Sequence, residues 1–115
     1  MEHMKQTIES FQDNRGIRIG TSNGYTVSIG FGGGHYCENY GAPLRDAKIL
    51  PTSTMEVAIM NKAQEFVCLP HDVAGYVNVS QLGDIVAAVE ANDWARVCFL
   101  CGVSEEDESK FPKKD

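Results

Sequence analysis

The sequence lacks several features that would place it in a class of protein at once. Its ten lysines and arginines are scattered without forming a basic stripe, and sixteen acidic residues give the 115-residue chain a net charge of −6. Binding to a nucleic-acid backbone depends on clustered cations, so we do not expect it here. No apolar run approaches the roughly 20 residues of a membrane span, and the polar N-terminal stretch lacks the apolar core of a secretion signal. We therefore expect a protein of the cytoplasm that makes no membrane contact.

The expected compartment decides how the four cysteines are interpreted. The four cysteines of a cytoplasmic chain are expected to be thiols or metal ligands rather than disulfides. A hydrophobic content of 43% is ordinary for a globular protein, and the length matches one domain. We expect a single domain over residues 1–115. Within it, residues 1–14 are expected to be a short helix or a frayed segment, and residues 104–115 a flexible charged tail or a final short helical turn.

Two stretches of the chain alternate apolar and polar residues. Such period-two alternation is typical of a strand with one buried face. In residues 17–31 it is interrupted by Asn23-Gly24, which supplies the positive φ angles of a tight hairpin turn. In residues 54–69 it is interrupted by the turn sequence Asn-Lys-Ala-Gln. We therefore expect two antiparallel β-hairpins, with a short edge strand at residues 75–77.

After Asn78 the period of the apolar residues becomes that of a helix. Asn78 is expected to cap a helix near residues 79–91, with Gln81 as its reciprocal partner. A second helix follows, which Gly102 would end. The two apolar stripes consist of Leu82, Ile85, Val86 and Val89, and of Trp94, Val97, Cys98 and Cys101. Strands followed by helices predict an α+β fold, an antiparallel sheet of two β-hairpins with C-terminal helices packed on one face.

The glycine-rich stretch "GFGGGHYCENYG", residues 30–41, has two interpretations. It does not match the dinucleotide-binding fingerprint, because His35 occupies the third glycine position, and it lacks the Gly-Lys ending of a P-loop. One interpretation is a strand end with a bulge and a flexible turn. The other is an exposed contact loop, since two tyrosines beside a histidine form a usable recognition surface. The candidate binding residues are His35, Tyr36, Glu38, Asn39, Tyr40, Arg45 and Asp46.

The cysteines beyond this loop also allow more than one interpretation. Cys98-x-x-Cys101-Gly has the form of a zinc knuckle, and Cys68-x-x-His71 would complete a structural zinc set. However, Cys98 and Cys101 continue the apolar stripe of the second helix, and free cysteine packs as a small hydrophobe. A redox pair is the weakest interpretation, because no strand precedes the motif. We predict core packing without a cofactor, with zinc as the alternative.

No set of nucleophile, base and orienting group can be assembled from the spacing of the residues. A Cys37–His71 pair is conceivable, but nothing local supports it. We therefore predict that the protein is not an enzyme.

Two segments together resemble small accessory proteins of bacteriophages and prophages. They are "NGYTVSIGFGGGHYCENYG" and "MEVAIMNKAQEFVCLPHDVAGYVNVSQLGDIVAAVE", and the resemblance covers about residues 23–90. It implies a strand, a glycine-containing turn, a further strand and a capped helix. It also implies an accessory gene of the kind that often acts against host defence. No individual binding residue is carried over from it.

Three functions are consistent with these features. The first is a stoichiometric, anti-CRISPR-like inhibitor that binds a host defence protein or complex in the bacterial cytoplasm. The second is a sponge for a nucleotide immune signal, with Arg15, Arg18 and Arg45 as phosphate partners. The third is a zinc-stabilised binding module. A homo-oligomer is compatible with all three.

Overall fold

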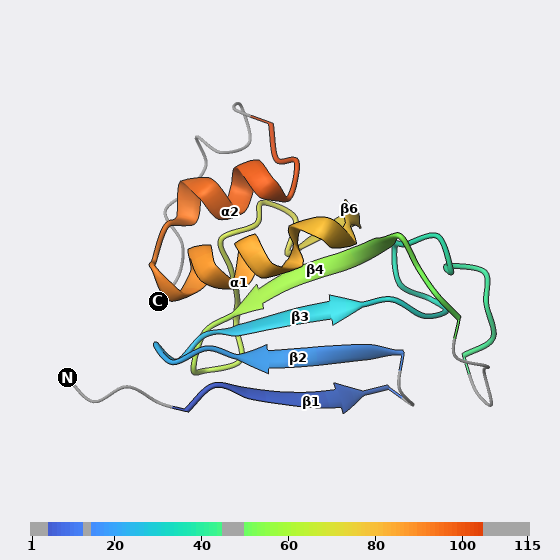
Figure 1. Ribbon diagram of the computed structural model, residues 1–115, viewed down its shortest axis with the longest axis horizontal. Coiled ribbons are helices and arrows are strands. Elements are labelled where there is room, and N and C mark those ends of the chain that lie inside the picture. The colour runs from blue at the N-terminus through green and yellow to red at the C-terminus, as the bar shows by residue number, and fades with distance from the viewer. Residues whose placement is uncertain (1–4, 13–14, 45–49, 105–115) are drawn as a thin grey trace.

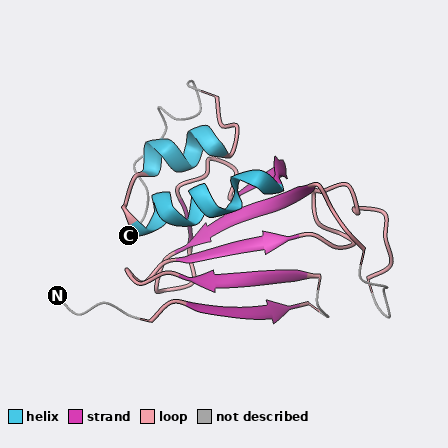
Figure 2. Ribbon diagram, in the orientation of Figure 1, coloured by secondary structure: helices cyan, strands magenta, loops and turns pink. Residues whose placement is uncertain are grey.

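The computed structural model, which describes residues 5–12, 15–44 and 50–104, contains one antiparallel sheet and two helices (Figure 1). Strands β1 to β4 are neighbours in sequence order, while β5 and β6 both pair with the far side of β4. The helices α1 and α2 lie together on one side of the sheet (Figure 2). The strands are β1 (Thr7–Phe11), β2 (Gly16–Gly20), β3 (Thr26–Gly30), β4 (Thr54–Met60), β5 (Phe66–Val67) and β6 (Val73–Asn78), and the helices are α1 (Leu82–Glu90) and α2 (Trp94–Leu100). The predicted α+β fold is confirmed. In the described part of the chain, no helix has the length and apolar character to cross a membrane.

Both predicted hairpins are present, and their turns share one geometry. In the first turn the Thr21 amide donates to the Tyr25 carbonyl at 2.8 Å, and in the second the Asn61 amide donates to the Glu65 carbonyl at 3.0 Å. Each is a three-residue loop with one residue of positive φ, Gly24 at 92° and Gln64 at 65°. The prediction that both Asn23 and Gly24 have a positive φ was wrong, because a three-residue hairpin loop needs only one residue of positive φ.

The expectation of a helix or a frayed segment at residues 1–14 was wrong for the part that is described. Residues Thr7–Phe11 form strand β1 and pair with all five residues of β2. The side chains of β1 are largely exposed, so apolar burial was too weak a signal to predict it. Strand β1 is held instead by backbone hydrogen bonds to β2, whose edge would otherwise lack a partner strand. The predicted tail lies outside the described residues except for Ser104.

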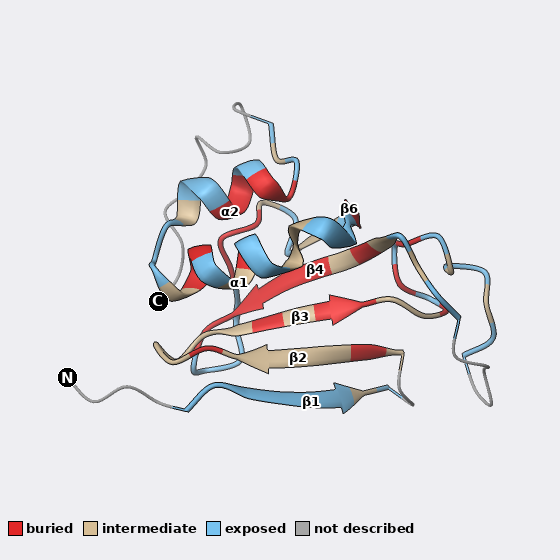
Figure 3. Ribbon diagram, viewed as in Figure 1, coloured by how far each residue is buried: buried red, intermediate tan, exposed pale blue. Residues whose placement is uncertain are grey.

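The core lies between the sheet and the helices (Figure 3). One face of β3 and β4 contributes fully buried Val27, Val57 and Ile59, and α1 contributes Ile85 and Val89. Each such side chain stabilises the fold by about 1.5–3 kcal/mol through apolar burial. Both predicted stripes pack against this core, so the helical period was interpreted correctly.

The ends of both helices are set by local hydrogen bonds. The Asn78 side chain accepts from the Ser80 amide, but a 3-10 turn at Val79–Gln81 comes first, so α1 begins at Leu82. Asp93 caps α2 by accepting from the Arg96 amide at 3.2 Å. The chain leaves α2 through Gly102, which has a φ of 76° as a C-terminal glycine should.

Candidate binding surface

The connection between β3 and β4 lies at one end of the sheet and is held in place by hydrogen bonds. Its described parts, residues 31–44 and 50–53, contain no helix or strand. The Asn39 side-chain amide donates to the Phe31 carbonyl at 3.1 Å and to the Pro51 carbonyl at 3.3 Å. The Glu38 amide donates to Thr54 Oγ1 at 2.8 Å, and the Ser53 amide donates to the Glu38 carboxylate. The Ser53 amide lowers the pKa of Glu38, which indicates that the loop is held best when Glu38 is ionised.

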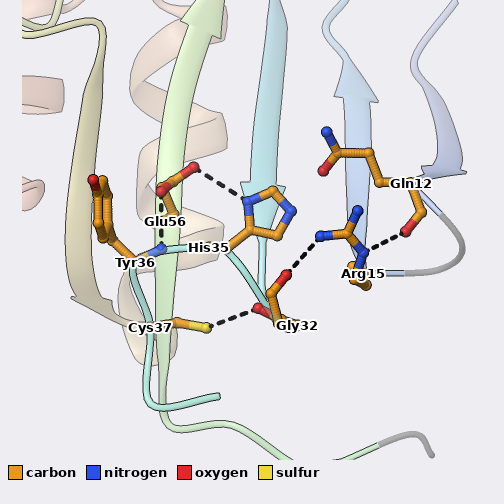
Figure 4. A network of polar contacts seen from close by, with 8 residues as sticks. Gln12, Arg15, Gly32, His35, Tyr36, Cys37 and Glu56 are labelled. Atoms are coloured by element: carbon orange, nitrogen blue, oxygen red, sulfur yellow. Dashed lines mark hydrogen bonds and ion pairs between the residues drawn. The ribbon is translucent and has the colours of Figure 1, made fainter. Parts of the chain in front are cut away.

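His35 lies inside the loop rather than on its surface. Its Nδ1 is 3.2 Å from Oε1 of Glu56 on β4, and the other oxygen of Glu56 accepts from the Tyr36 amide at 2.9 Å (Figure 4). The ring covers Gly30, where a Cβ would collide with it. Phe11 approaches the ring edge-on, with centroids 5.9 Å apart. The prediction of His35 as a contact residue was therefore wrong, because the ring fills a space that Gly30 leaves on the sheet.

The glycines of the loop allow close packing and do not form a phosphate cradle. A Cβ at Gly33 would collide with the Ala42 carbonyl, and Gly34 has a φ of 84°. The Arg15 guanidinium donates to the Gly33 carbonyl at 2.6 Å and to the Gln12 carbonyl at 3.1 Å. These bonds clamp the loop to the turn between β1 and β2 (Figure 4). The flexible-turn interpretation is thus replaced by a loop that is packed and bonded along most of its described length.

Two tyrosines of the loop remain exposed and are stacked on each other. Tyr36 and Tyr40 are 49% and 50% exposed, with ring centroids 5.5 Å apart and an interplanar angle of 3°. Tyr76 of β6 is 58% exposed, and its amide donates to the Tyr36 carbonyl at 2.8 Å. We call these three residues, Tyr36, Tyr40 and Tyr76, the tyrosine surface.

A β-bulge in β6 places Tyr76 beside the loop. Val57 pairs with Ala74 and Met55 with Val77, so Gly75 and Tyr76 together oppose the single residue Glu56. Tyr76 takes a φ of 54°, which is unfavourable for a residue with a bulky side chain. A Cβ at Gly75 would lie only 2.7 Å from the Cβ of Tyr36, so this glycine lets the strand and the loop approach. Bulges of this kind re-aim a side chain, and they are common beside functional sites.

The structure divides the predicted contact residues into two roles. Tyr36 and Tyr40 are exposed, His35 and Asn39 hold the loop in place, and Glu38 is exposed while it also bonds within the loop. The remaining two candidates, Arg45 and Asp46, lie outside the described residues. Sequence reasoning missed Tyr76 and the anchoring carboxylate of Glu56. Glycine inside a strand pattern, as at Gly75, is the signal that could have indicated a bulge and its exposed neighbour.

The cysteines belong to the core. Cys98 and Cys101 are buried as their helical spacing predicted, and the sulfur atoms of Cys68 and Cys98 are 3.7 Å apart. Burial raises the pKa of Cys101 to about 12, with a further contribution from Cys98. The alternative zinc set of Cys68, His71, Cys98 and Cys101 is not assembled. His71 is exposed in a turn, and across the residues described no three His, Cys, Asp or Glu side chains are grouped as metal ligands.

No protein-family model, curated protein or solved structure matches the chain. The resemblance to phage accessory proteins therefore stays an expectation from the sequence.

Proposed function

We propose that the protein is a stoichiometric binder that engages a bacterial antiviral defence protein through the tyrosine surface. The observation that carries this proposal is Tyr76, held at a φ of 54° in a bulge and exposed beside the stacked pair Tyr36 and Tyr40. A non-glycine residue in this region of φ costs about 1–3 kcal/mol and persists where the surroundings impose it. Strain of this kind at an exposed aromatic residue supports a role in recognition.

The tyrosine surface has the chemistry of a protein-binding site. Tyrosine rings supply large apolar areas with a polar tip, and they lose little conformational entropy on binding. Here the loop is already ordered by the bonds of Glu56 to His35 and Tyr36. Ordering before binding lowers the entropic cost of association and raises affinity.

The roles of the neighbouring polar groups support a binder rather than an enzyme. His35 is bonded to Glu56, and Cys37 is buried with its thiol directed at the Gly32 carbonyl. Burial also raises the pKa of Cys37, which disfavours the reactive thiolate. The groups that could act as acid, base or nucleophile thus serve the structure of the loop, and the aromatic rings face the solvent.

The class of target rests on the sequence. The resemblance over residues 23–90 points to a phage accessory gene, and a net charge of −6 favours a basic partner. A stoichiometric inhibitor needs only affinity for its target. The sponge for a nucleotide signal is less favoured, since the Arg15 guanidinium is already bonded to Gln12 and Gly33.

The test is a pull-down from a bacterial lysate in which both bound proteins and bound small molecules are identified. We expect capture of a component of a defence system, followed by measurement of its affinity for purified protein. Replacing Tyr36 and Tyr40 together by alanine should weaken binding by about 2 kcal/mol or more, because central aromatic residues dominate interface energies.

Phe99→Ala is the matched control, since Phe99 is 72% exposed on α2 and is not part of the tyrosine surface. The control should bind like the unchanged protein. An equal loss of affinity in the control, or no loss in the tyrosine variant, would place the contact elsewhere. A bound nucleotide without a protein partner would favour the sponge, and turnover of a substrate would contradict the binder.

A further inference from the structure

Strand β1 is an edge strand whose outer side has no partner among the described residues. It pairs with β2 alone over five consecutive residues, with no proline, glycine or bulge to interrupt it. Ile8, its second residue, is 69% exposed. Proteins usually protect such an edge, because its free N–H and C=O groups can pair with another chain.

The register shows which backbone groups of β1 face outward. The Thr21 amide donates to Tyr25, and the Arg15 carbonyl accepts from Phe31, so odd-numbered residues of β2 face β3. Directions alternate along a strand, so Gly16, Arg18 and Gly20 face β1. Their partners in β1 are Phe11, Glu9 and Thr7, whose groups are therefore used within the sheet. The outward groups belong to the alternate residues Gln6, Ile8 and Ser10, with Ile8 in the middle.

The outer edge of β1 is complementary to itself. When two copies pair antiparallel about a two-fold axis at Ile8, Ile8 lies opposite Ile8 of the second copy, and their backbones exchange hydrogen bonds. In this register Lys5 lies diagonal to Glu9 of the second copy, within reach of a long side chain. The pairing thus buries the exposed isoleucine and joins opposite charges twice.

We propose that β1 is a homodimerisation edge, at which two copies of the chain join their sheets about Ile8. The partner is a second copy because both the apolar contact and the charge pairs are satisfied by the strand itself. The interface goes beyond the proposed function, since β1 and β6 lie at opposite edges of the sheet. Dimerisation would leave the tyrosine surface of each copy free and present two of them in one particle.

The test is the molar mass of the full chain in solution, measured by sedimentation or light scattering from micromolar to millimolar concentration. We expect a concentration-dependent shift to twice the mass of the chain. Glu9→Lys should weaken the dimer by about tenfold, since it places like charges beside each other. The double reversal Lys5→Glu with Glu9→Lys restores opposite charges and should recover the dimer.

Glu65→Lys is the control, because it changes the net charge equally at an exposed position in the turn before β5. It should dimerise like the unchanged protein, and thermal unfolding of each variant checks that the fold is retained. A chain that stays monomeric at every concentration would overturn the proposal. A dimer that Glu9→Lys leaves intact, or that the double reversal fails to restore, would also overturn it.

Discussion

Tyr76 and Gln64 have the same backbone conformation for different reasons. Both are non-glycine residues with positive φ, 54° and 65°. Gln64 closes the turn of the second hairpin, where the corresponding residue of the first hairpin is Gly24. Tyr76 sits in the bulge of β6, and its backbone amide donates to the carbonyl of the loop residue Tyr36. At position 64, any residue that tolerates a positive φ would close the turn. At position 76, the exposed aromatic ring is what distinguishes the residue.

Replacing either residue with glycine should therefore separate stability from binding. We expect Tyr76→Gly and Gln64→Gly each to raise the free energy of unfolding by about 1 kcal/mol or less, because glycine relieves the positive φ at some cost in entropy. Only Tyr76→Gly should lose affinity for the captured partner, by about tenfold or more. Chemical denaturation and a binding titration on the same preparations measure both quantities. Full affinity in Tyr76→Gly would remove Tyr76 from the contact surface.

The first hairpin turn and α1 form a joint that holds the sheet to the helices. The Asn23 side-chain amide donates to the Val89 carbonyl at 2.8 Å, which also accepts from the Asn92 amide at 3.0 Å at the end of the helix. The Ser22 amide and hydroxyl donate to the Glu90 carboxylate, which also accepts from Gln6. Two turn residues, Ser22 and Asn23, thus connect the first hairpin to the two last residues of α1, Val89 and Glu90.

Asn23→Ala should lower the free energy of unfolding by about 1–2 kcal/mol, because the turn loses the bonds of the Asn23 amide to the Val89 carbonyl and to the Asn92 side chain. Asn23→Asp should lower it at least as much, since it places a negative charge beside the negative end of the helix dipole. Urea titration of the three proteins measures the differences. Equal stability in all three would mean that water replaces the amide at this joint without cost.

At the scale of the whole molecule, every thiol is buried in the fold. Cys37 is buried within the glycine-rich loop, while Cys68, Cys98 and Cys101 lie in the core between sheet and helices. Burial raises the pKa of Cys37 and brings that of Cys101 to about 12, so these thiols stay protonated near neutral pH. Access of a reagent to the thiols therefore reports on the opening of the fold.

We expect a thiol reagent such as DTNB to react with the native protein only slowly at pH 8, and with all four cysteines at once in guanidinium chloride. The slow rate should increase with denaturant as the open population increases. Absorbance of the released thiolate measures both the rate and the number of reacting thiols. Rapid reaction of one thiol in the native protein would show a local opening at that cysteine.

The two hairpins and the two helices could be predicted because their signals are local. Period-two alternation marks the faces of β3 and β4, and helical spacing marks the stripes that contain Ile85 and Cys98. The candidate site was predicted only in its location. Exposure within the loop depends on Glu56 and Gly75, which lie elsewhere in the chain and meet the loop only in the fold, and on Gly30, which the His35 ring covers.

The sequence by itself determined the class of fold and the core, because turns, caps and apolar periodicity act between residues a few positions apart. Only the tertiary structure decided that residues 7–11 form a strand, because its partner is the open edge of β2 rather than a buried face. Only the tertiary structure separated buried His35 from exposed Tyr36, through one carboxylate of β4 that binds both. The bulge at Tyr76 also depends on the tertiary structure, since two residues of β6 lie opposite a single residue of β4 and the Tyr76 amide bonds to the loop.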